Sequence, residues 1–195
     1  NLQPSFDSWT TIFLFAAVQG FFVSLVLIIQ NARSNKAKLF LALILLLFSI
    51  TLVEYVLYWT KYLYYFPHFS NISGGFPFLI GPLFYYYFKN VFENYKPGKK
   101  DALALVPFIV HIIYLSRYYF RPAEIKQKFM LLPQIPGQTA SVQLMPSLQI
   151  SSMIIYLCII ILSYRALSAT NPETKRWFNY LTGLFAFFII SFASY

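Results

Sequence analysis

The sequence is poor in the residues on which disulfide frameworks, metal sites and soluble folds depend. Its 195 residues include one cysteine, two histidines and six acidic residues, and charged residues of all kinds make up 11%. A single cysteine, Cys158, excludes a disulfide within the chain, and its place in an apolar run gives it a packing role. His68 and His111 lack the spacing of a Cys/His metal site, so we expect no metal and no cofactor.

The motifs of common catalytic sites are missing as well. The chain has no Ser/His/Asp set, no pair of intramembrane aspartates, no His-Glu-x-x-His and no glycine-rich phosphate loop. Ser73–Gly75 is predicted to be a turn. The sequence therefore predicts a protein that is not an enzyme.

Apolar residues dominate what is present. The chain is 58% hydrophobic and 21% aromatic, whereas soluble domains carry about a quarter charged residues. A soluble fold of this size could not bury so much apolar surface, so we expect the lipid bilayer to be its solvent. The formal net charge of +9 lies mostly in short loops, where membrane topology and anionic headgroups explain it better than direct binding of nucleic acid.

The apolar runs predict an all-α polytopic membrane helix bundle, with six transmembrane helices in a single domain over residues 1–195. The first run, from Ser8 to Ala32, has no charged residue and exceeds the about 20 residues that a crossing needs. The predicted helices cover residues 9–31, 37–62, 76–95, 101–120, 147–168 and 171–195.

Polar residues mark the helix ends and one helix contact. The predicted caps are Ser8, Asp101, Ser147, and either Thr170 or Asn171.

Gln19-Gly20 and Ser24 give the first helix a small, polar face for contact with another helix. The longest connection, 121–146, contains four prolines, and we expect a short surface helix near Ala123–Met130.

The basic residues predict the orientation. Ten of the fifteen fall on one side of the predicted bundle, and the positive-inside rule places that side in the cytoplasm. They are Arg33, Lys36, Lys38, Lys89, Lys96, Lys99, Lys100, Arg165, Lys175 and Arg176. The N-terminus is then outside, and so is the end of the sixth helix. We expect the intact protein to return to the cytoplasm through a seventh helix.

The outer halves of the helices 37–62 and 101–120 carry the unusual polar residues. The candidate ligand-binding residues are Glu54, Tyr58, His111, Tyr114, Arg117 and Arg121. Their spacing of three or four lets each set share a helix face, and intramembrane ionisable groups usually face the bundle interior. One interpretation is a pocket open to the outside. The other is a Glu54–Arg117 or Glu54–His111 pair that only fixes packing.

Two further features also allow two interpretations. His111 could relay protons or bind a metal, but without a second histidine four residues away a structural, hydrogen-bonded histidine is favoured. Gly81-Pro82 lies inside the predicted helix 76–95 and could be a signalling hinge or a static kink.

One stretch resembles a known family. FLIGPLFYYYFK at residues 78–89, followed by KKDALALVPF at residues 99–108, resembles the membrane region of Bacteroidetes-type AraC-family transcriptional regulators. The resemblance implies a bacterial inner-membrane sensor or anchor module, followed by a cytoplasmic helix-turn-helix domain through which alone the protein would contact DNA.

No helix-turn-helix occurs within these 195 residues, so we expect the DNA-binding domain beyond Tyr195. The signal, a small molecule or peptide, and a homodimeric or other membrane partner remain open. The other function classes are a small transporter and a structural or accessory subunit of a membrane complex.

Overall fold

The computed structural model describes residues 3–31, 36–93, 95, 98–131, 139–168 and 171–194. Within these ranges the chain forms helices and turns and no β-strand, which confirms the predicted all-α class. The α-helices are α1 (Ser8–Asn31), α2 (Lys36–Trp59), α3 (Pro77–Glu93), α4 (Val106–Tyr119), α5 (Ala123–Leu131), α6 (Thr139–Ser168) and α7 (Pro172–Ala193). Short 3₁₀ helices are η1 (Tyr62–Tyr64), η2 (Pro67–Phe69) and η3 (Lys99–Leu105).

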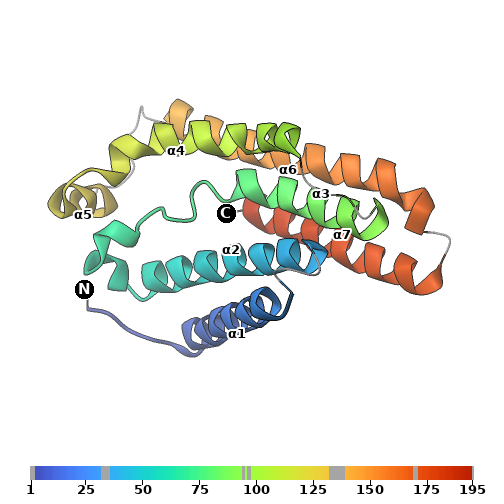
Figure 1. Ribbon diagram of the computed structural model, residues 1–195. Coiled ribbons are helices and arrows are strands. Elements are labelled where there is room, and N and C mark those ends of the chain that lie inside the picture. Colours follow the sequence, from blue (N-terminus) through green and yellow to red (C-terminus); the bar gives the residue numbers. More distant parts are fainter. Residues whose placement is uncertain are drawn as a thin grey trace.

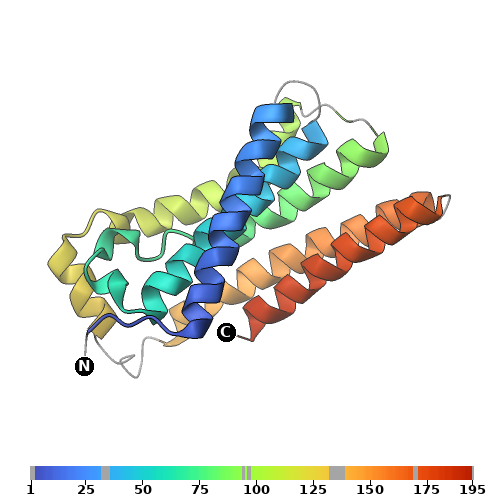
Figure 2. The ribbon, with the colours of Figure 1, turned by 90° about the horizontal axis from the view of Figure 1, so that it is seen from below.

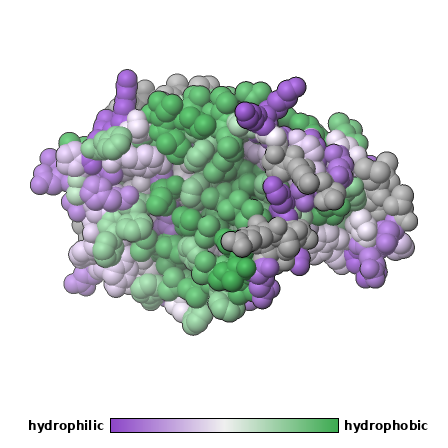
Figure 3. All heavy atoms as spheres, in the orientation of Figure 1, coloured by the Kyte–Doolittle hydropathy of each residue, from purple (hydrophilic) through white to green (hydrophobic). Residues whose placement is uncertain are grey.

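Five described helices are long and apolar enough to cross a membrane. These stretches are Ser8–Gln30, Lys36–Trp59, Lys99–Tyr119, Met145–Arg165 and Pro172–Ala193. Apolar side chains cover the middle of the face in Figure 3, and hydrophilic ones gather toward both ends. Both observations indicate a multi-pass membrane protein.

The predicted helix 76–95 is shorter than a full crossing. α3 has 17 residues and is about 25 Å long, against a hydrocarbon core of about 30 Å. It packs against α2 on one side and α6 on the other, and Ile80, Phe84 and Phe88 are almost wholly buried. The described helices of spanning length thus number five. α3 is shorter and forms the buried core of the bundle, so the predicted count of six crossings is not confirmed.

Helices that pack together run antiparallel, except that α3 and α6 run in the same direction. α1 packs on α2, α2 on α3, α3 on α6, and α6 on α7. The ends of α1, α3 and α6 lie at one end of the bundle, whereas the N-terminus, α5 and the C-terminus lie at the other (Figures 1 and 2). Most of the basic residues that were predicted to be cytoplasmic therefore share one end; Arg33 and Lys96 lie outside the described residues.

Aromatic side chains fill the space between α3, α6 and α7. The rings of Phe84 and Phe185 stack with centroids 4.4 Å apart. Near the basic end, Trp177 donates through Nε1 to the Tyr87 hydroxyl at 2.7 Å, and the Tyr164 hydroxyl donates to Glu93 at 2.9 Å. The buried Tyr87 and Tyr164 thus keep partners for their hydroxyls while their rings supply the packing.

Several predicted helix boundaries are wrong for local reasons. Asp7, not Ser8, caps α1, because its Oδ1 accepts from the Thr10 N–H at 2.7 Å; this bond holds the pKa of Asp7 below its usual value. α2 ends at Trp59 instead of residue 62, because Lys61 adopts a left-handed conformation with φ of 64°. Ser147 is not a cap, since α6 begins at Thr139 and runs through Pro146.

The remaining end signals agree better with the structure. The Asn171 side chain accepts from the Glu173 N–H and caps α7; Thr170 lies outside the described residues. Asp101 accepts from the Gly98 N–H at 2.5 Å, but it caps η3, which precedes α4. The expected surface helix is α5.

The small residues of α1 do mediate a helix contact. A Cβ atom added to Gly20 would lie 2.2 Å from Ser49 Oγ on α2. Ser24 is fully buried and donates to the Ala42 carbonyl of α2 at 2.8 Å. Gln19, in contrast, is exposed. Close approach at small residues is the usual way in which helices associate in lipid.

Gly81 has a packing role in α3. A Cβ atom there would lie 2.7 Å from Cδ2 of Tyr156 on α6 and 3.2 Å from its Cβ. α3 continues through Gly81 and Pro82, and both are buried. The contact explains the glycine without movement; whether Gly81-Pro82 also acts as a hinge stays a hypothesis.

We predict that Gly81→Ala lowers the stability of the bundle. The added methyl group meets the inner atoms of Tyr156, which cannot rotate away, and overpacking of this kind costs about 1–3 kcal/mol. Thermal unfolding in detergent measures the effect. Gly183→Ala is the matched control, because no atom lies within 4 Å of a Cβ at Gly183; an equal loss of stability in both variants would contradict the packing role.

Candidate functional site

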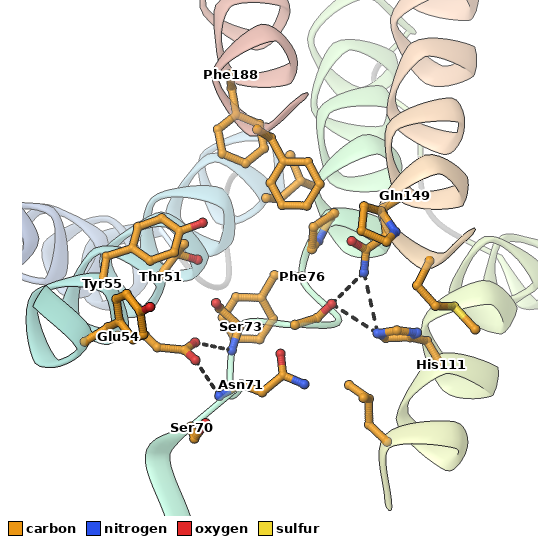
Figure 4. A pocket seen from close by; sticks show the side chains of 18 of the residues that line it. Thr51, Glu54, Tyr55, Ser70, Asn71, Ser73, Phe76, His111, Gln149 and Phe188 are labelled. Carbon is orange, nitrogen blue, oxygen red and sulfur yellow. Dashed lines mark hydrogen bonds between the residues drawn. The ribbon is translucent and has the colours of Figure 1, made fainter. Parts of the chain in front are cut away.

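A cavity of about 560 Å³ opens between α2, the segment 60–76 and α4, and α6 and α7 also line it. We call it the α2–α4 pocket. Apolar atoms dominate its surface, with polar groups from opposite walls facing it (Figure 4). Its polar lining residues are Thr51, Glu54, Tyr55, Tyr58, Ser70, Asn71, Ser73, His111, Tyr114 and Gln149, and its apolar ones include Phe76, Ile80, Met145, Phe188 and Phe192.

Glu54 of α2 binds the backbone of the segment 60–76. Its Oε1 accepts from the Asn71 N–H at 2.5 Å and its Oε2 from the Ser73 N–H at 2.8 Å. These bonds replace the expected pair with Arg117 or His111, neither of which binds the carboxylate. Hydrogen bonds to an ionised group are about twice as strong as neutral ones, so Glu54 fixes this segment firmly.

The segment 60–76 is irregular, and other side chains satisfy more of its backbone. Asn71 has a left-handed φ of 63°, which asparagine tolerates better than most residues. Its carbonyl accepts from the Tyr119 hydroxyl at 2.7 Å, and the Tyr118 hydroxyl donates to Ser70 at 2.8 Å. Irregular backbone inside a membrane protein requires such partners.

His111 and Gln149 hold the same segment from the other wall. The Gly74 carbonyl accepts from Gln149 Nε2 at 2.7 Å and lies 3.1 Å from His111 Nε2. Because a carbonyl only accepts, Nε2 of His111 carries the proton and Nδ1 is the acceptor. Nδ1 is buried and has no hydrogen-bond partner in the described structure. His111 therefore supports the loop, as the structural interpretation predicts, and the described residues contain no cluster that could hold a metal ion.

α5 closes the far side of the segment through a buried lysine. Lys126 is 1% exposed, and its Nζ donates to the Tyr119 carbonyl at 2.8 Å and lies 3.2 Å from Nδ1 of His68. Gln127 donates to the Tyr64 carbonyl at 2.8 Å. The sequence gives no sign of this burial, because Lys126 is a single lysine in a short polar helix.

The structure brings together four of the six candidate site residues. Glu54, Tyr58, His111 and Tyr114 line the α2–α4 pocket. Arg117 does not; it is exposed and lies about 120° around the helix from His111.

Arg121 is also absent from the lining, since it follows the end of α4 and its guanidinium lies 4.8 Å from the centre of the Phe129 ring. Residues three or four positions apart on a helix do share a face. Over several such steps, however, the residues move gradually around the helix, so those far apart no longer face the same side.

Comparison with known proteins finds no matching family model, curated protein or solved structure.

We predict that Lys126→Met destabilises the packing of α5 on the segment 60–76. The substitution leaves the Tyr119 carbonyl and His68 without their donor, and an unsatisfied buried polar group costs about 1–3 kcal/mol. Limited proteolysis within residues 60–76, together with thermal unfolding, measures the loss.

Lys128→Met is the control, since Lys128 is exposed on the same helix. If both variants resist protease as the unmodified protein does, Lys126 does not hold this segment.

Proposed function

We propose that the chain is the membrane sensor module of a one-component transcriptional regulator, and that a small molecule bound in the α2–α4 pocket is its signal. The observation that carries the proposal is the pocket itself. A volume of about 560 Å³ falls within the range of about 300–1,000 Å³ typical of small-molecule sites. A mostly apolar surface with a few convergent polar groups is also typical of such sites.

The arrangement of the walls supports a sensing role. Glu54 comes from α2, His111 from α4, Gln149 from α6 and Phe188 from α7 (Figure 4). A ligand that touches all four helices would favour one arrangement of them over another. Differential affinity for two arrangements is the physical requirement for a signal.

The orientation is part of the proposal. The positive-inside rule places the end of the bundle that carries Lys36, Lys99 and Arg165 in the cytoplasm, with the N-terminus and the pocket outside. In this orientation α3 also crosses the membrane, although it is short, because α2 and α6 cover it. The proposed number of crossings is then six. The resemblance of residues 78–108 to AraC-type regulators supports a cytoplasmic DNA-binding domain beyond residue 195 as the output.

Cysteine labelling tests the orientation. In a Cys158→Ala background, we expect a cysteine at Glu124 to react with a membrane-impermeant maleimide in intact cells. A cysteine at Lys99 should react only after the membrane is opened. The reverse pattern would place the pocket in the cytoplasm and overturn the proposed direction of signalling.

A pocket-filling variant tests the function. We predict that compounds which raise the melting temperature of the purified protein lose this effect in Thr51→Trp, because the indole occupies the pocket next to Glu54. Trp substitution at Thr11 is the control, since Thr11 is exposed and does not line the pocket. If no compound from a broad library stabilises the protein, or if the hits bind Thr51→Trp equally well, the pocket is not the sensor site.

A further inference from the structure

We infer that the α2–α4 pocket is selective for organic cations, that is, for a protonated or quaternary amine attached to an apolar body. The inference depends on the proposed ligand-binding function and specifies the chemical class of the ligand. It follows from the charge of the lining, the aromatic rings that line the same pocket, and the polar groups on the opposite wall that already have partners within the protein.

The charge of the pocket is unbalanced. Of the described residues that line it, Glu54 is the one carboxylate, and neither lysine nor arginine is among them. The partners of Glu54 are two neutral backbone N–H groups, which orient the carboxylate without neutralising it. A charge inside a membrane protein is usually paired or serves as the counter-ion of a ligand. A cationic ligand would supply the missing partner, and an anionic ligand would be repelled.

Aromatic rings offer the second element of a cation site. Tyr58, one helical turn from Glu54 on α2, and Tyr114 of α4 both line the pocket and are 56% and 54% exposed. The face of an aromatic ring attracts a cation by about 0.5–2 kcal/mol. Acid and ring faces together distinguish a cation from a neutral molecule of the same shape.

The polar groups named on the opposite wall already have hydrogen-bond partners within the protein. The amide of Gln149 and Nε2 of His111 both face the Gly74 carbonyl, so these groups are engaged within the protein (Figure 4). Phe188 and Phe192 of α7 and Met145 of α6 complete an apolar surface. The apolar body of the ligand would pack there, with its charge toward α2.

A matched set of probes tests the inference. Phenyltrimethylammonium, its uncharged carbon isostere tert-butylbenzene and the anion benzenesulfonate are titrated into the protein in an uncharged maltoside detergent, and binding is followed by ligand-observed NMR. We expect the cation to bind at least about ten-fold more tightly than the isostere, and the anion not to bind. The same titrations with Thr51→Trp show which part of the binding takes place in the pocket, because this variant fills it.

Two sets of variants identify the groups responsible. Tyr58→Leu should weaken binding of the cation several-fold and leave the isostere unchanged, whereas Tyr58→Phe, which keeps the ring face, should bind both probes as the unmodified protein does. Glu54→Gln should abolish the preference for the cation, with Glu124→Gln, on the exposed surface of α5, as its control. Because Glu54 also holds Asn71 and Ser73, the Tyr58 pair keeps the test valid if Glu54→Gln fails to fold.

The outcomes separate this inference from the proposed function. Equal binding of cation and isostere, lost in both cases in Thr51→Trp, would overturn cation selectivity and leave a ligand pocket. Tighter binding of benzenesulfonate would also overturn the inference. If no probe binds and no library compound stabilises the protein, both the inference and the proposed function fail.

Discussion

The structure depends on one constraint: the segment 60–76 is not a regular helix, yet it packs against α2, α4, α5 and α6. Each backbone N–H and C=O that this packing buries needs a partner. Glu54 supplies acceptors to Asn71 and Ser73, Tyr119 supplies a donor to Asn71, and Gln149 supplies a donor to Gly74. Side chains from α2, α4 and α6 therefore converge on one short segment, and α5 contacts it through Lys126, beside His68, and Gln127, which donates to the Tyr64 carbonyl.

The α2–α4 pocket is a consequence of this convergence. A loop held away from close helix packing leaves space beside it, and the polar groups that hold the loop become part of the lining of that space. Glu54 then has two roles that follow from the same geometry, because its oxygens fix the loop while its charge faces the pocket. In our proposal, a cation that binds Glu54 acts directly on the element that joins α2, α4 and α6.

Hydropathy predicts the helices well because a run of apolar residues in lipid needs no particular periodicity. It does not decide whether α3 crosses, because the apolar run Pro77–Glu93 is shorter than a full crossing and is buried among other helices. The partners of Glu54 could not be predicted, because every residue except proline carries a backbone N–H and a side-chain pair with Arg117 looks equally reasonable in sequence. Tyr58, His111 and Tyr114 were found because three- and four-residue spacing holds over one or two turns, whereas Lys126 and Gln149 carry no such signal.

Site-resolved hydrogen exchange of the purified protein in lipid nanodiscs tests the central claim most directly. If the Glu54 carboxylate holds the segment 60–76, the amides of Asn71 and Ser73 exchange slowly although both residues lie in a turn. The amide of Phe6, a residue that is 52% exposed and lies before the cap of α1, would exchange fast in the same sample. Exchange at Asn71 and Ser73 as fast as at Phe6 would show that Glu54 does not fix this segment, and the account of both the loop and the pocket would be wrong.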